Sequence, residues 1–525
     1  MKPWRIAFCA MCALLHAAPG VSRAAADVAA TARSLIIRLD LDEARRVLAD
    51  ADPDDPRVAL ERARLGVYQL DCDGAVVILS RPDVLKVDDG QALAEIARGC
   101  QRVTASLVGT TDEARGIEVR WQDDHDAVLA PVLLDTVEKA RDALTRDLEV
   151  DWPKPTRVVV VRDLLSLSAV TGLPYSSAQT TGTVAVAKWG RITLLSPRAS
   201  PHGYAWRDTI AHELTHLAVT RASGDQAPLW LQEGVAKREE IRWRPNGPFD
   251  DRPPSEAIVQ RGLELGLVPA LDKLGPSIAM LPSADAAMVA FAEVTSFVGF
   301  YVENGGSLAL SKLLLELKNG NDPNAALVGA SGANLKAWDR RWRAYIAARP
   351  HVVLPALLGI GGAKGEKVDA KLWRDLRDRS RLAQLLLARG HAGSALTELD
   401  RIEASRVPLA REVSETATAD ASMRWLRGRA LEEAGRAAEG EPLFNDPKQL
   451  LSSYGLWWAT RGRRAHLRGD DVVAGDSFDE AFGVDPLEPE VACESIDPTN
   501  LPRDPSRMPV CQAARARGQP PFDAD

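Results

Sequence analysis

The sequence predicts an α+β fold in which one mixed segment of helices and strands lies between two α-helical segments. In the middle of the chain, 156–161 is an apolar run with the length and the β-branched content of a buried strand. Two further runs, 183–187 and 191–195, flank a short turn at Trp189-Gly190 and predict a hairpin. The outer parts of the chain carry recurring small and large residues instead, a pattern that is typical of packed helical hairpins.

Apolar periodicity and glycine content divide the chain into domains. The period predicts helices in the mixed segment over 127–148, 286–302, 308–317 and 334–346. A glycine-rich bridge at 359–365 follows this segment. The expected organisation is a signal peptide (1–24), an N-terminal helical segment (25–115), the mixed domain (116–350), C-terminal helical repeats (366–490) and a disulfide-containing tail (491–525).

Length and composition are those of a globular protein of several domains. The 525 residues allow about three domains, and 46% hydrophobic with 26% charged residues is an ordinary composition. The net charge of −8 gives no indication of binding to nucleic acid or to an anionic membrane.

The first residues predict a secretory signal peptide. Lys2 and Arg5 form a basic start, 6–18 is apolar, and the alanines at 24–26 offer a cleavage site. The apolar run is too short to span a bilayer, and no later run reaches the required length. We therefore expect an exported protein, periplasmic or secreted, without a transmembrane segment.

The cysteines agree with export. Two of the six lie in the signal segment, which leaves an even number in an oxidising compartment. The remaining four are Cys72, Cys100, Cys493 and Cys511. Three connectivities are possible, and proximity in the sequence favours a bridge between the first two and another between the last two.

The stretch from His212 to His216 reads HELTH and predicts part of a zinc site. On a helix, positions i and i+4 share one face, so both histidines can reach one cation. Glu213 then lies beside the metal, where a carboxylate can accept a proton from metal-bound water. A catalytic zinc needs a third protein ligand and an open position.

The segment 228–236 reads PLWLQEGVA, and with the HELTH motif it resembles the glutamate zincins, the superfamily that includes thermolysin. In detail it is similar to bacterial peptidase MA-like domains. The resemblance implies that Glu233 is the third ligand of one zinc ion per chain. It also implies a thermolysin-like zincin fold for the mixed domain. Other zincins use a third histidine six residues after the second, with a glycine between them. Here Ala222 stands at the histidine position and Val219 at the glycine position, so that ligand is absent.

Two other carboxylates, Glu239 and Glu240, compete with Glu233 as the third ligand. Their charged neighbours predict a solvated, salt-bridged face instead. These neighbours are Lys237, Arg238 and Arg242.

The resemblance implies peptide hydrolysis with Glu213 as the general base, but the chain departs from the family pattern twice. Phe291 stands where a tyrosine would stabilise the oxyanion. Lys237 stands one turn after Glu233, where relatives of thermolysin place an acid that orients a histidine ligand. Candidate substitutes for the missing oxyanion donor are Tyr301, Tyr204 and His202, each of which could also be an ordinary partly buried ring.

The C-terminal helical segment shows repeats at the spacings of a tetratricopeptide repeat. Gly435 and Gly469 mark equivalent turns 34 residues apart. Small and large residues recur around them at Gly428, Gly440 and Phe444, and at Gly462, Ala474, Phe478 and Ala481. Such an array either binds a protein partner or covers and positions an enzyme. The N-terminal segment (25–115) shows a degenerate, tetratricopeptide-like version of the pattern, for which generic helical packing is the alternative.

Three functions fit these patterns. The first is an exported zinc metallopeptidase that acts on a peptide or protein substrate. The second is a zinc-binding but inactive peptidase-like protein that serves as an interaction scaffold through its tetratricopeptide-like repeats. The third, a metal-free interaction protein, requires both motifs to be accidental.

Overall fold

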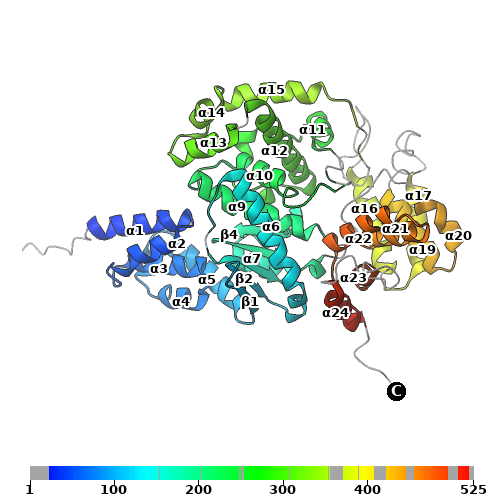
Figure 1. Cartoon of the computed structure of the whole chain (residues 1–525), viewed down its shortest axis with the longest axis horizontal. Coiled ribbons are helices and arrows are strands. Elements are labelled where there is room, and N and C mark those ends of the chain that lie inside the picture. Colours follow the sequence, from blue (N-terminus) through cyan, green and yellow to red (C-terminus); the bar gives the residue numbers. More distant parts are fainter. Residues whose placement is uncertain are drawn as a thin grey trace, which may run out of the picture.

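The fold, seen in a computed structural model, has helical segments on either side of a central mixed domain (Figure 1). The structure describes residues 23–152, 154–200, 203–247, 250, 254–306, 308–352, 354, 370–387, 389–406, 421–444, 455–494 and 507–518. Residues 1–22 of the expected signal segment and His202 lie outside these residues.

The N-terminal segment is helical, as the sequence predicts. Its helices are α1 (Arg23–Ile37), α2 (Leu41–Ala49), α3 (Pro56–Tyr68), α4 (Cys72–Ile78) and α5 (Gly90–Thr104). A disulfide joins Cys72, the first residue of α4, to Cys100 on α5, with 5.8 Å between the Cα atoms. Arg191 of the central sheet is fully buried and donates to the carbonyl oxygen of Val67 at 2.5 Å. This contact ties the helical segment to the sheet.

The central domain contains a five-stranded sheet with the order β1-β2-β3-β5-β4. The outer pairs are antiparallel and the inner pairs are parallel. The strands are β1 (Val108–Asp112), β2 (Ile117–Trp121), β3 (Thr156–Val161), β4 (Ala185–Lys188) and β5 (Arg191–Leu195). The predicted strand 156–161 and the predicted hairpin are present. β1 precedes residue 116, the expected start of the mixed domain, and pairs with β2.

Strand β3 is buried on both faces, which explains its continuous run of valines. Val158 and Val160 pack into the large core with α6 (Ala130–Leu148) and α9 (Trp206–Ser223). Val159 and Val161 pack on the other side with α7 (Leu164–Thr171) and Cys100 of α5. The sheet is therefore a middle layer, and α9 lies on one of its faces.

A helical subdomain completes the central domain. Its helices are α8 (Tyr175–Thr181), α10 (Leu229–Glu239), α11 (Ser255–Glu264), α12 (Ala284–Gly305), α13 (Ala309–Lys318), α14 (Pro323–Ser331) and α15 (Leu335–Ala347). Phe297 of α12 packs edge to face against Trp230 of α10 and against Trp342 of α15. These rings fix α10 against the long helix α12.

α12 is also the one helix in the described part of the chain that is long and apolar enough to cross a membrane. It departs from the expectation that no run after the signal segment reaches this length. Of its most apolar window, 56% is buried inside the protein, and Val294 and Phe297 are fully buried. This burial is that of a core helix.

The C-terminal segment forms helical hairpins. Their helices are α16 (Ala370–Leu387), α17 (Ala392–Arg406), α19 (Ala421–Glu433), α20 (Ala437–Gly440), α21 (Gly455–Leu467) and α22 (Asp471–Val484). A side chain at Gly462 would lie 2.7 Å from the ring of Phe478, and one at Gly428 would lie 2.6 Å from that of Phe444. Small residues therefore let paired helices approach, and a phenylalanine fills each gap.

The end of the chain packs back onto the central domain. Trp206 at the start of α9 donates from Nε1 to the carbonyl oxygen of Phe482 on α22. A second disulfide joins Cys493 of α23 (Pro489–Glu494) to Cys511 of α24 (Met508–Gly518). Both disulfides join the pairs that proximity in the sequence favours.

Candidate metal centre

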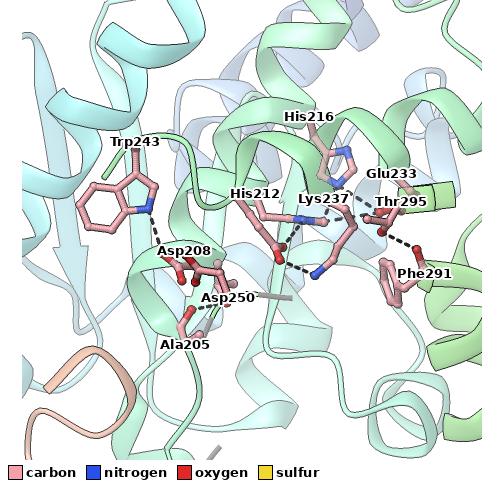
Figure 2. A network of polar contacts seen from close by, with 12 residues as sticks. Ala205, Asp208, His212, His216, Glu233, Lys237, Trp243, Asp250, Phe291 and Thr295 are labelled. Atoms are coloured by element: carbon pink, nitrogen blue, oxygen red, sulfur yellow. Dashed lines mark hydrogen bonds and ion pairs between the residues drawn. The ribbon is translucent and has the colours of Figure 1, made fainter. Parts of the chain in front are cut away.

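Helix α9 presents both histidines of the motif on one face. The ring centroids of His212 and His216 are 4.9 Å apart, as the i, i+4 spacing requires. The opposite side of α9 holds Ile210 and Leu214, which are fully buried in the main core. Burial of that side therefore aims the histidines away from the core and toward α10 (Figure 2).

Helix α10 brings Glu233 to the histidines because it packs closely on α12. A Cβ at Gly234 would lie 2.3 Å from Val298 Cγ2 and 2.7 Å from the carbonyl oxygen of Val294. Only glycine permits this approach. The next residue back along α10, Glu233, then points to α9 and is 9% exposed.

Three ligand atoms form a triangle of the size that zinc requires. His212 Nε2 and His216 Nε2 are 3.2 Å apart, and Glu233 Oε2 is 3.6 Å from the first and 3.5 Å from the second. Ligand atoms about 2.0–2.1 Å from a tetrahedral zinc are roughly 3.3–3.4 Å apart. The group could therefore hold a metal ion without rearrangement of the backbone.

The competing carboxylates, Glu239 and Glu240, take other positions. Glu239 is 2% exposed and pairs with Arg238 and, at 3.3 Å, with Arg242. Glu240 does reach His212, but at Nδ1, on the far side of the ring from the metal position. Both carboxylates form salt bridges, as the sequence predicts. They are not on a solvated face, however, because the side chains of Glu239 and Glu240 are only 1% and 21% exposed.

His212, His216 and Glu233 shift one another's pKa values. Burial raises the pKa of Glu233, but the two histidines outweigh burial and hold it far below its usual range. Burial lowers the pKa of His212, but hydrogen bonds with Glu233 and Glu240 raise it to about 10. A cation at this position would replace protons on the histidines, so metal binding releases protons.

Glu213 lies in the same cavity and is only 7% exposed. Burial raises its pKa, while His216, His212 and a backbone hydrogen bond from Ala187 oppose this shift. A carboxyl with a raised pKa is better suited to accept and return a proton near neutral pH. The side chain therefore has the burial and the pKa direction of a general base.

The cavity around this group is large enough for a polypeptide. Its volume is about 1440 Å³, and one wall is formed by residues 183–188, which include all of β4. β4 is the last strand of the sheet and pairs only with β5, so its outer edge is free among the described strands. Asp479 and Glu480 of α22 also line it, so the C-terminal segment contributes to the same cavity.

Neither Tyr301 nor Tyr204, the two described candidates for the oxyanion donor, lines the cavity at the metal position. Phe291 does line the cavity, with its ring 6.3 Å from that of His212, and it offers no hydroxyl. Tyr301 is fully buried and donates to the carbonyl oxygen of Ala309. Tyr204 donates to the carbonyl oxygen of Leu195 and does not line the cavity. Both hydroxyls are used in packing, and His202 lies outside the described residues.

A second group, Asp123-Asp124-His125, was missed by sequence reasoning and also has the spacing for a metal ion. Its setting differs, because the side chains of His125 and Asp124 are 63% and 78% exposed. Asp123 already pairs with Arg198 at 2.7 Å. Solvated carboxylates of this kind are common without a metal, so the buried group on α9 and α10 is the candidate centre.

Comparison with known proteins agrees with this site. Residues 174–348 match the family model described as Peptidase MA superfamily. The matched segment contains β4, β5, α9, α10 and α12, and so it includes all three residues of the candidate centre. No curated protein matches the chain. The match supports a peptidase-like domain in the middle of the chain.

Proposed function

We propose that the chain is an exported zinc metallopeptidase that hydrolyses peptide bonds in a peptide or protein substrate. The observation that carries this proposal is the ligand triangle of His212, His216 and Glu233, whose edges of 3.2–3.6 Å fit one zinc ion. Glu213 lies in the same cavity, beside the free edge of β4. The two disulfides agree with an oxidising compartment.

The chain's own residues supply positioning and proton transfer. Bound zinc would lower the pKa of a coordinated water and polarise the carbonyl group of the substrate. Glu213 accepts a proton from the water as its oxygen bonds to the carbonyl carbon, and it returns the proton to the nitrogen as the C–N bond breaks. Burial of Glu213 favours the protonated form that this second step needs.

The free edge of β4 offers a place for the substrate backbone. An extended peptide that adds to this edge would form main-chain hydrogen bonds. Such bonds contribute affinity that does not depend on the side chains of the peptide. Residues 183–188 line the cavity, so a peptide on this edge would pass the three ligands.

The alternative is a zinc-binding but inactive peptidase-like protein that acts as a helical-repeat scaffold. Phe291 favours it, because the ring faces His212 in the cavity and cannot donate a hydrogen bond. Loss of one oxyanion donor typically costs about 10²–10³-fold in rate. The helical hairpins of the C-terminal segment would then bind the partner.

A peptide-library digest separates the two functions. The wild-type chain should cleave peptides, and a chelator should abolish cleavage until zinc is restored. Glu213→Gln should retain zinc, since Glu213 is not a ligand, and should lose about 10²–10⁴-fold in rate or more. Zinc bound without any chelator-sensitive cleavage would favour the scaffold. Absence of zinc from the wild-type chain would contradict both.

A further inference from the structure

We propose that Glu240, held by Lys237, is the positioning residue of His212. It fixes the imidazole so that Nε2 faces the metal position. The inference rests on the proposed zinc site. It also gives a role to Lys237, which stands where the family pattern has an acid, and to its partner Glu240.

The first support is the geometry around the ring of His212. Glu240 Oε2 lies 3.2 Å from Nδ1, and Glu233 Oε2 lies 3.6 Å from Nε2. Each nitrogen therefore faces a different carboxylate. A hydrogen bond donated by Nδ1 to Glu240 leaves the lone pair of Nε2 for a cation, and it also makes that nitrogen more basic.

The second support is the spacing on α10. Seven residues make nearly two helical turns, so Glu233, Lys237 and Glu240 lie on one face of the helix. That face is turned to α9, as the contacts of both glutamates with His212 show. The acid that is missing one turn after Glu233 is therefore supplied one turn later.

The third support is that the two carboxylate oxygens of Glu240 contact different residues. Oε1 accepts a hydrogen bond from Lys237 Nζ, and Oε2 faces His212. The side chains of His212, Glu240 and Lys237 are only 12%, 21% and 30% exposed, so water screens these contacts little. Lys237 thus compensates the charge of Glu240 and limits its rotation. Figure 2 draws Lys237 next to His212 in the view of the site, and both residues line the cavity.

The other histidine has a weaker partner. His216 Nδ1 faces the amide oxygen of Gln232 at 3.4 Å, which is a neutral acceptor at a longer distance. His212 is therefore the ligand whose orientation depends on a carboxylate.

Zinc affinity tests the role without any need for catalysis. We would measure competition between the purified full chain and a chromogenic chelator, for wild type, Glu240→Ala, Glu240→Gln and Lys237→Met. Glu240→Ala should weaken zinc binding about 10–100-fold. Glu240→Gln should lose less, because an amide oxygen can still accept from Nδ1. Lys237→Met should weaken zinc binding less than Glu240→Ala, since Lys237 acts only through its contact with Glu240.

Glu239→Gln is the matched control. Glu239 is the neighbouring carboxylate, it is 2% exposed, and its partners are arginines rather than a histidine. This variant should keep wild-type zinc affinity even if it is less stable. Thermal unfolding of the metal-free variants shows whether each one is folded.

The outcomes separate this inference from the function on which it rests. If the wild type binds zinc and Glu240→Ala binds it equally well, the positioning role is overturned and the zinc site stands. If Glu239→Gln weakens binding as much as Glu240→Ala, the effect is structural and the role is again overturned. If the wild type binds no zinc, the proposed function itself fails.

Discussion

Trp206 and Phe482 are 276 residues apart in the sequence, and the indole Nε1 of the first donates to the carbonyl oxygen of the second at 3.3 Å. That carbonyl belongs to the last turn of α22, where helical carbonyls have no partner within the helix. The helix that carries both histidines therefore begins against the C-terminal segment.

We expect Trp206→Phe to lower the free energy of unfolding by about 1–3 kcal/mol, because it leaves a buried carbonyl without a hydrogen bond. Trp121→Phe is the control. The indole Nε1 of Trp121 is buried without a hydrogen bond to any described residue, so this variant loses none. Urea unfolding of both variants gives the comparison. Equal losses would show that the bond to Phe482 contributes nothing beyond ring packing.

We expect one zinc per wild-type chain by elemental mass spectrometry, and His216→Ala should lose it. His125→Ala is the control, because His125 belongs to the exposed group 123–125 that also has metal-like spacing. If His125→Ala loses the metal and His216→Ala keeps it, the metal site is the group 123–125 instead.

Gly234→Ala should destabilise the chain by about 1–3 kcal/mol, since the new methyl group would lie 2.3 Å from Val298 and push α10 away from α12. The same shift moves Glu233, so zinc affinity should fall as well. Gly299→Ala provides the control on α12, where nothing lies within 4 Å of an added Cβ. That variant should be as stable as the wild type or slightly more stable. Urea unfolding measures the change in stability, and chelator competition measures the change in zinc affinity.

Stability should fall with rising pH because of Glu293. The carboxyl is fully buried, its oxygens have no hydrogen-bond partner among the described residues, and burial raises its pKa to about 8 from 4.5. Between these values the folded chain holds a proton that the unfolded chain has released. The free energy of unfolding therefore decreases as pH rises, on the order of 1 kcal/mol per pH unit.

Glu293→Gln removes this titration. Its stability relative to the wild type should grow between about pH 5 and pH 8, measured by urea unfolding at fixed ionic strength. A difference that is constant over this range would mean that Glu293 is charged in the folded protein.

The four cysteines should resist thiol labelling in the unreduced, denatured protein and react after reduction, because the structure pairs all of them. Replacing Cys72 and Cys100 together by serine should cost about 2–4 kcal/mol on the loop-entropy account. Labelling of all four thiols without reductant would contradict both bridges.

Sequence patterns predict the elements whose signal is local. The run 156–161 is recognisable because β3 is buried on both faces, and the HELTH motif places two histidines on one face by helical geometry alone. Strand β1 has no such signal, since four of its five residues are exposed and its sequence, VGTTD, does not alternate. Its place in the sheet depends on pairing with β2.

The role of Glu240 depends on tertiary structure in the same way. Beside Lys237 and Arg238 its carboxylate reads as part of a solvated surface, and only the packing of α10 against α9 turns it to His212. Phe291 shows the reverse case. Its place in the cavity agrees with the sequence pattern, and the hydroxyl that Phe291 lacks is not supplied by Tyr301 or Tyr204.

Helix α9 is anchored at both ends by parts of the chain that lie outside the central domain. Trp206 at its start binds Phe482, and Arg221 near its end donates to the carbonyl oxygen of Leu39 at 2.9 Å. The histidines sit between these anchors on one uninterrupted helix. The N-terminal and C-terminal flanks therefore each hold one end of the helix that carries both histidines.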